Sequence, residues 1–192
     1  AHNLVYIQDD IVFGFHRLAI VNLDENGVQP FVFKNTHLVC NGEIYNSTSL
    51  QISSNDTDEW YGKSDCDCIQ PLIQKIGIHD TCCKLDGVFA FMYLDNDKDL
   101  YVARDAFGVR PLYWNPNGGL FASEAKSLIT LTDTIEPFPP GCWWSSKHGL
   151  VRWYEHIYPT IDSTKTMVKQ ALITAVEKRL MSDRPIGCLL SG

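Results

Sequence analysis

The chain has 192 residues, 45% of them hydrophobic, and a formal net charge of −7. This length and composition are ordinary for a globular protein with one good core and the beginning of a second domain. The acidic balance, without a long run of Lys or Arg, argues against general binding to nucleic acid or to a membrane surface, and no apolar run approaches the ~20 residues of a membrane span.

The spacing of the cysteines decides how they are interpreted. Neighbours such as Cys66 and Cys68, or Cys82 and Cys83, do not match the paired C-x-x-C spacing of zinc sites. We therefore predict reduced thiols, no metal site and a cytoplasmic location. The seven cysteines are Cys40, Cys66, Cys68, Cys82, Cys83, Cys142 and Cys188.

The first quarter of the chain has the pattern of strands and turns. Residues 11–21 read as a strand that runs on into further extended chain, and residues 22–29 are rich in turn formers. A short polar turn inside residues 31–40 predicts a hairpin. A polar segment, 47–63, predicts loop with a short helix.

A helix with an identifiable start is predicted from Ser64. Its hydroxyl can cap the first free N–H groups, and Asp67, three residues on, can reach back as in a capping box. We expect this helix to run to about Ile76. Pro71 inside it predicts a kink.

The apolar run at residues 87–94 is too continuous for a strand that is wet on one face. It predicts a strand covered on both sides. The elements expected after it are a turn at 95–99, a strand at 100–104, a hairpin turn at 115–119, a short helix at 123–129, a Pro-rich loop at 137–141 and a last hairpin ending near Tyr154.

A second unit is predicted after a linker at 155–162. From Ser163 the apolar period becomes helical, and a short buried strand is expected at 186–190, before a Ser-Gly turn. Helix, strand and turn predict the opening of an α/β nucleotide-binding domain at 163–192, after a first domain at 1–154. The helical stripe consists of Met167, Val168, Ala171, Leu172, Ala175, Val176 and Leu180.

Several side chains suit a site that holds a free amino acid and breaks its side-chain amide. Such a site needs a cation for the α-carboxylate, carboxylates for the α-ammonium, and donors where the carbonyl oxygen becomes an oxyanion. Arg17, Asp65 and the Asn41-Gly42-Glu43 run offer these groups. Each also has an ordinary explanation, as a surface arginine, a helix N-terminal carboxylate and a turn pair. The residues alone therefore indicate a site for a small anion or an amino acid.

The order of motifs along the chain resembles the class II glutamine amidotransferases. This resemblance implies an α+β fold of the N-terminal-nucleophile (Ntn) hydrolase type, an αββα sandwich of two antiparallel sheets between helical layers. The resemblance covers essentially the whole chain. It rests on residues 15–21, 29–30, 41–46, 64–66, 85–91 and 103–113.

Within that family, residues 138–141 and 181–192 resemble the asparagine synthetases. The resemblance implies that the last residues begin an ATP-pyrophosphatase domain. Leu190 would lie near the adenine, and Ser191 and Gly192 would begin the phosphate loop, since backbone N–H groups and a small hydroxyl suit phosphate oxygens. ATP and Mg²⁺ would then be used outside this chain, and the glutaminase domain would need no cofactor.

The resemblance also implies roles at the glutamine site. Arg17 would bind the glutamine carboxylate, Glu43 and Asp65 would hold the α-ammonium, and Asn41 and Gly42 would form the oxyanion hole. The backbone that accompanies Arg17 would come from Leu18, Ala19, Ile20 and Val21.

The nucleophile of the resembled family is a cysteine at the N-terminus, with its own α-amine as base, whereas this sequence begins Ala1-His2-Asn3. Cys40 has no free α-amine, so we predict that it is a core residue. We expect that the chain is a fragment, that the nucleophile lies upstream, and that the fragment alone does not hydrolyse glutamine.

Three functions follow as hypotheses. The first is a glutamine-hydrolysing asparagine synthetase that uses glutamine, aspartate and ATP, for which a homodimer is left open. The second is a related amidotransferase with another acceptor, of the β-lactam synthetase type. The third is a glutamine-binding module without hydrolysis. The Leu-Leu-Ser-Gly ending favours an ATP-pyrophosphatase partner domain over phosphoribosylamine or glucosamine phosphate synthesis.

Overall fold

The computed structural model describes residues 2–8, 10–52, 64–156 and 164–190. Its helices are α1 (Ser47–Ile52), α2 (Ile69–Lys84) and α3 (Lys165–Lys178), with 3₁₀ turns η1 (Glu25–Gly27), η2 (Cys66–Cys68) and η3 (Ala125–Ser127). Its strands are β1 (His2–Gln8), β2 (Ile11–Arg17), β3 (Phe31–Phe33), β4 (Thr36–Ile44), β5 (Gly87–Leu94), β6 (Leu100–Arg104), β7 (Tyr113–Trp114), β8 (Phe121–Ala122), β9 (Glu136–Pro137), β10 (Cys142–Ser145) and β11 (Gly149–Arg152).

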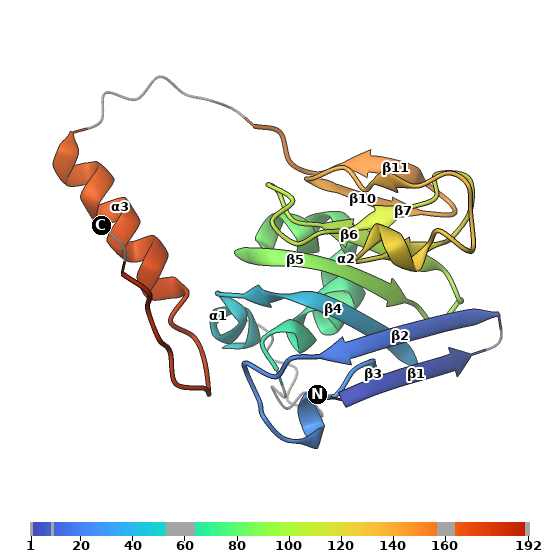
Figure 1. Cartoon of the computed structure of the whole chain (residues 1–192), viewed down its shortest axis with the longest axis horizontal. Coiled ribbons are helices and arrows are strands. Elements are labelled where there is room, and N and C mark those ends of the chain that lie inside the picture. The colour runs from blue at the N-terminus through green and yellow to red at the C-terminus, as the bar shows by residue number, and fades with distance from the viewer. Residues whose placement is uncertain (1, 9, 53–63, 157–163, 191–192) are drawn as a thin grey trace.

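The strands form one large sheet and two small ones (Figure 1). The large sheet is antiparallel, with the strand order β11-β10-β6-β5-β4-β3. The β1–β2 hairpin and the β8-β7-β9 sheet are separate from it. The predicted hairpin at residues 31–40 is confirmed as β3 and β4, which pair from Phe31–Leu38 to Phe33–Thr36.

Strand β5 is covered on both faces, as its continuous apolar run predicts. Phe89, Phe91 and Tyr93 pack into the core cluster that also contains Ile69 and Ile73 of α2. The alternate residues face the small sheets, where Ala90 belongs to a second cluster around Trp114 and Leu94 to a third around Phe13. Side chains alternate along a strand, so a strand buried on both faces needs apolar residues at every position.

The predicted helix after Ser64 differs in detail. Its start is confirmed in part, because Asp67 Oδ2 accepts a hydrogen bond from the Ser64 N–H (3.1 Å). The predicted cap by the Ser64 hydroxyl is wrong: this group donates to Asp65 Oδ1 at 3.1 Å, and α2 begins only after the turn η2. The predicted kink at Pro71 is wrong, since Pro71 lies in the first turn of α2, where N–H groups lack an intrahelical acceptor and proline is tolerated. The break occurs at Gly77 (φ 79°, ψ 166°), a backbone conformation that favours glycine, so the predicted end near Ile76 is confirmed and a second helical segment runs from the kink to Lys84.

A buried carboxylate organises the turn after β6. Asp105 is 1% exposed, and its two oxygens accept four backbone N–H groups at 3.0–3.2 Å, from Phe89, Phe107, Val109 and Arg110. The neighbouring Arg104 guanidinium donates in turn to three carbonyl oxygens at 2.6–2.9 Å, and burial lowers the pKa of this side chain. The turn that carries Arg110 is therefore fixed to β5.

The segment after residue 163 forms only part of what its sequence predicts. Helix α3 begins with Thr164, whose hydroxyl accepts the Met167 N–H (3.2 Å), but none of the residues of α3 is buried. The buried strand predicted at 186–190 is wrong: this stretch is irregular, and Leu189 and Leu190 are fully exposed. A buried strand needs a neighbouring strand for its backbone groups, and none of the described strands lies beside it.

The predicted linker at 155–162 lies mostly outside the described residues, which resume at 164. The predicted short helix at 123–129 is the 3₁₀ turn η3, which is limited to Ala125–Ser127. Among the described helices, none is long and apolar enough to cross a bilayer.

Candidate functional site

The site begins at the C-terminal half of β4, where the sheet has an open edge. Strand β3 pairs with β4 only as far as Leu38, and beyond it no described strand covers this edge. In an antiparallel strand, alternate residues direct both backbone groups to the same side. The backbone groups of Cys40, Gly42 and Ile44 therefore point to the open edge.

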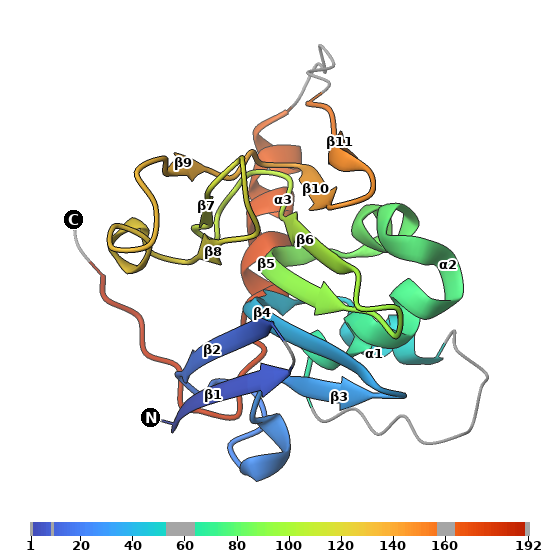
Figure 2. The ribbon, with the colours of Figure 1, turned by 90° about the vertical axis from the view of Figure 1, so that its right-hand side faces the viewer.

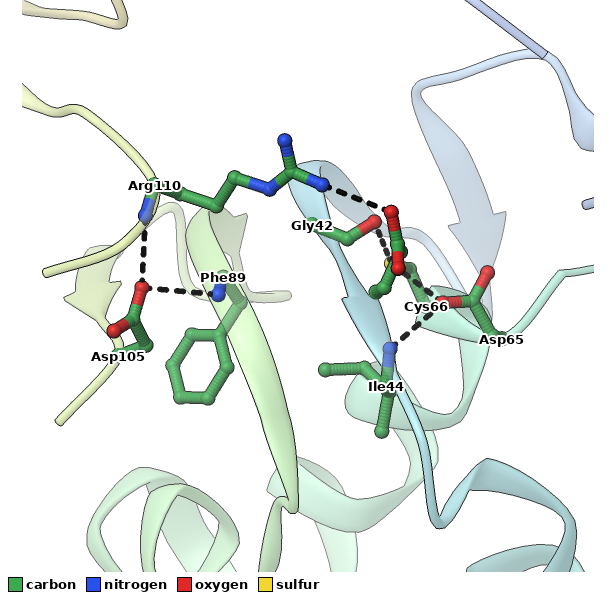
Figure 3. A network of polar contacts seen from close by, with 8 residues as sticks. Gly42, Ile44, Asp65, Cys66, Phe89, Asp105 and Arg110 are labelled. Atoms are coloured by element: carbon green, nitrogen blue, oxygen red, sulfur yellow. Dashed lines mark hydrogen bonds and ion pairs between the residues drawn. The ribbon is translucent and has the colours of Figure 1, made fainter. Parts of the chain in front are cut away.

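Side chains replace the missing strand along this edge. The Gln29 side-chain amide donates to Cys40 O (3.0 Å) and accepts the Cys40 N–H (2.6 Å). The Cys66 thiol donates to Gly42 O at 3.6 Å, and the Ile44 N–H donates to Asp65 Oδ2 at 2.7 Å, as Figure 3 shows. Asp65 is 7% exposed, so the predicted ammonium-binding carboxylate is held in a fixed place.

Gly42 lies where no side chain fits. A Cβ atom at this position would lie 2.4 Å from Val88 O and 2.8 Å from the Phe89 Cα, both backbone atoms of β5. Its N–H, by the alternation of the ladder, faces the open edge beside Asp65. A backbone donor at the edge of the sheet, on a residue with no side chain of its own, suits a developing oxyanion.

The side chains of Asn41 and Glu43 lie on the opposite face of the sheet from those of Cys40 and Ile44, because side chains alternate along a strand. Asn41 Nδ2 donates to Ser123 Oγ at 3.5 Å. Glu43 Oε1 forms an ion pair with Arg110 Nη2 at 3.0 Å, and the Arg110 side chain extends toward β4 in Figure 3. Glu43, predicted to hold an ammonium group, thus has a guanidinium partner in this structure.

Arg17, at the end of β2, is buried and holds the loop that follows it. Its guanidinium donates to Asp24 O at 2.8 Å and to Val21 O at 3.4 Å, and it also contacts Asn22 O. The fork geometry of the guanidinium suits several acceptors at once. The loop that the sequence assigns to the glutamine carboxylate is therefore shaped around this side chain.

A polar hollow of about 640 Å³ lies between this loop and Asp65. The structure brings Val21 and Asp65 to it together, while Asn41 and Glu43 lie on the other face of β4 and do not line it. Leu18, also assigned to the site, is 85% exposed. The hollow is lined by Val21, Asn22, Leu23, Asp24, Ser47, Thr48, Ser64, Asp65, Met181 and Asp183.

The family model for the glutamine amidotransferase domain matches residues 2–147 of this chain. The chain belongs to this family. The match includes β1 to β10 and all the residues that line the hollow ahead of α2. The predicted resemblance to class II glutamine amidotransferases is thereby confirmed.

Relatives of the glutamine amidotransferase domain carry a more specific name. Asparagine synthetase B [glutamine-hydrolyzing] of Escherichia coli is 37% identical over 201 residues, covering 98% of this chain and 36% of that protein. The human asparagine synthetase [glutamine-hydrolyzing] is 38% identical over 218 residues, covering 94% of this chain and 38% of that protein. The chain thus spans little more than a third of the length of these curated relatives.

Solved structures confirm the Ntn-type α+β fold of this glutamine amidotransferase domain. The glutamine phosphoribosylpyrophosphate amidotransferase of B. subtilis, 24% identical, superposes with a TM-score of 0.61 over 76% of this chain and 35% of its own. The structure of the allosteric regulatory enzyme of purine biosynthesis is 27% identical, with a TM-score of 0.62, over 76% of this chain and 36% of its own.

The cysteines of the amidotransferase domain lack the features of a nucleophile. Cys40 is buried between β4 and α2, as predicted for a core residue. A hydrogen bond with Cys40 and burial raise the pKa of the Cys66 thiol well above its ordinary value, and burial does the same for the thiols of Cys68 and Cys82. A nucleophilic thiol needs a lowered pKa, so these thiols belong to the core.

Two features of the candidate site could not be found from local sequence. Asp183 comes from the far end of the chain, and the partner of Glu43 comes from a turn 67 residues away.

At the predicted nucleotide end, Leu190 is exposed, and Ser191 and Gly192 lie outside the described residues. Among the described residues, no group of three or more His, Cys, Asp or Glu side chains could hold a metal ion.

Proposed function

We propose that the hollow beside β4 binds the amino-acid end of glutamine. The C-terminal half of β4 stabilises the oxyanion that forms when the side-chain amide is attacked. The observation that carries this proposal is the fixed Asp65 carboxylate, which lines the hollow while its Oδ2 holds the Ile44 N–H two residues from Gly42. An ammonium group held by Asp65 and an oxyanion held by the Gly42 N–H would then lie beside the same end of β4.

The other assigned residues act around this pair in the proposal. Arg17 supplies positive charge beside the loop and shapes the backbone of Val21 and Asn22, so that the glutamine carboxylate meets a cation and ordered backbone. Asn41, next to Gly42 in the strand, is proposed as a second donor, although its side chain lies on the other face of β4 beside Ser123. Glu43 lies on the other face of β4 from the hollow, so it would become a second carboxylate for the ammonium only by releasing Arg110 and meeting glutamine on that face.

For the complete protein we propose glutamine-dependent asparagine synthesis, because the curated relatives carry that name. Glutamine would be hydrolysed to glutamate and ammonia by a terminal cysteine outside this chain, and ammonia would be transferred to aspartate activated by ATP with Mg²⁺. We place the glutaminase domain at 1–154 and the start of the synthetase domain at 163–192, where Leu190, Ser191 and Gly192 would meet ATP. We propose a cytoplasmic location, with a homodimer left open.

Asn41→Ala separates the two half-reactions in the complete protein. We expect the glutamine-dependent rate to fall about 100-fold, the usual effect of removing one oxyanion donor, while the rate with free ammonia is unchanged. Both rates are measured as asparagine formed, with glutamate release as a check. Asn96→Ala, in the exposed turn after β5, is the control and should change neither rate.

Equal loss of both activities in Asn41→Ala would contradict an oxyanion role. Glutamine binding without glutamate release by the complete wild-type protein would instead favour the binding module. Transfer of ammonia to an acceptor other than aspartate would favour the β-lactam synthetase type.

A further inference from the structure

The chain after α3 returns to the loop that follows β2. The Asp183 N–H donates to Ile20 O at 3.0 Å, and the Asn22 N–H donates to Asp183 Oδ2 at 2.7 Å. Two hydrogen bonds of opposite direction thus connect Asp183 to Ile20 and to Asn22, the second of which is 161 positions away. In Figure 2 the chain that leaves α3 passes beside the segment between β2 and β3.

The end of α3 is itself anchored to the first domain, which brings Asp183 to the loop. Lys178 Nζ forms an ion pair with Asp86 Oδ2 at 2.5 Å. The Arg179 guanidinium lies 4.9 Å from the centre of the Tyr45 ring, a cation–π contact. These two contacts, from consecutive residues, fix the helix end against the turns that flank β4 and β5.

Asp183 also reaches the hollow, which it lines together with Met181. The loop between β2 and η1 is thereby held from two sides. On one side, the Arg17 guanidinium donates hydrogen bonds to carbonyl oxygens of the loop. From the other side, Asp183 holds one of its N–H groups and one of its carbonyl groups.

We infer that Asp183 is a positioning residue for glutamine: it fixes the loop at residues 20–22 in the shape that binds the substrate, and so connects the segment after α3 to the glutamine site. The inference rests on the proposed function. Ile20 and Val21 are the residues whose backbone would accompany the glutamine carboxylate. A loop fixed before binding loses less conformational entropy when the ligand arrives, so losing this contact should weaken glutamine binding.

The contact also lies close to the predicted nucleotide end of the chain. Asp183 is seven residues from Leu190 along an irregular stretch. A change in that stretch would be transmitted to the loop through the two hydrogen bonds. Glutamine affinity would then depend on the state of the synthetase side.

The test uses three variants of the complete protein. Asp183→Ala removes the acceptor for the Asn22 N–H. Asp183→Asn keeps an oxygen acceptor in nearly the same place. Asp133→Ala removes the same charge from an exposed position with no assigned role. Two quantities are measured for each variant: hydrogen exchange of the amides at residues 20–24, and KM for glutamine against kcat with free ammonia.

We expect Asp183→Ala to raise KM for glutamine about tenfold and to speed exchange of the Asn22 amide by a similar factor, because a hydrogen bond to a charged acceptor is lost. The kcat with free ammonia should not change. Asp183→Asn should bring KM for glutamine and the exchange rate of the Asn22 amide close to their wild-type values, and Asp133→Ala should match the wild type.

Unchanged KM in Asp183→Ala, with or without faster exchange, overturns the inference, because the contact would then have no effect on the substrate. An equal fall of both activities also overturns it, since the effect would be on folding. If the wild-type protein neither binds nor hydrolyses glutamine, the proposed function has failed, and the inference fails with it rather than by itself.

Discussion

Asp105→Ala should lower the free energy of unfolding by about 4 kcal/mol, because the loss of a buried hydrogen-bonded charge leaves its partners without an acceptor. Its carboxylate satisfies the N–H groups of Phe89, Phe107, Val109 and Arg110 in a place that is 1% exposed to solvent. Urea unfolding followed by circular dichroism measures the change.

Two further variants sharpen this result. Asp105→Asn should also destabilise the protein, by about 2 kcal/mol, since an amide keeps one oxygen but turns an NH₂ group toward N–H donors. Asp97→Ala, an exposed aspartate in the turn after β5, should stay within about 0.5 kcal/mol of the wild type. A loss in Asp105→Ala no larger than in Asp97→Ala would show that the turn does not depend on the carboxylate.

Gly42→Ala should cost about 3 kcal/mol of stability and abolish glutamine hydrolysis, because the added Cβ cannot be accommodated without moving backbone. It would lie 2.4 Å from Val88 O and 2.8 Å from the Phe89 Cα. Moving β4 away from β5 would displace the Gly42 N–H and the Ile44 N–H that binds Asp65. The midpoint of urea unfolding and glutamate release report the two effects.

Gly14→Ala provides a matched control, since Gly14 also lies in a strand. A Cβ there would meet nothing within 4 Å, so this variant should be neutral or slightly stabilising, by about 0.5 kcal/mol. If Gly42→Ala is as stable as Gly14→Ala and still hydrolyses glutamine, the close approach of β4 and β5 does not shape the site.

The features that the sequence predicts correctly are those with a local cause. The uninterrupted apolar run of β5 predicts a strand covered on both faces, because each alternate position must be apolar. The spacing of Ser64 and Asp67 predicts the start of a helix, because the carboxylate can reach the N–H three residues back. The order of motifs around Arg17, Asn41 and Asp65 identifies the family.

The features that it misses depend on distant partners. An apolar run such as 186–190 reads as a buried strand, but it carries no information on which strand would lie beside it. Helix α2 contains both a proline and a glycine, and it is broken at Gly77 and not at Pro71. Pro71 does not break it because it lies in the first turn, where its missing N–H has no intrahelical acceptor to lose. The charge of Glu43 indicates an ammonium site, whereas the Arg110 that pairs with it lies on a turn placed by Asp105.

The most direct test of the proposed site is a calorimetric titration of the complete protein with L-glutamine, with D-glutamine as the control ligand. The account predicts that the wild type binds the L-isomer only, and that Asp65→Asn binds it about tenfold more weakly, because the ammonium group loses a charged partner. Asp133→Ala should bind as the wild type does. Equal affinity of Asp65→Asn and wild type for L-glutamine, or no binding by the wild type, would contradict a glutamine site beside β4.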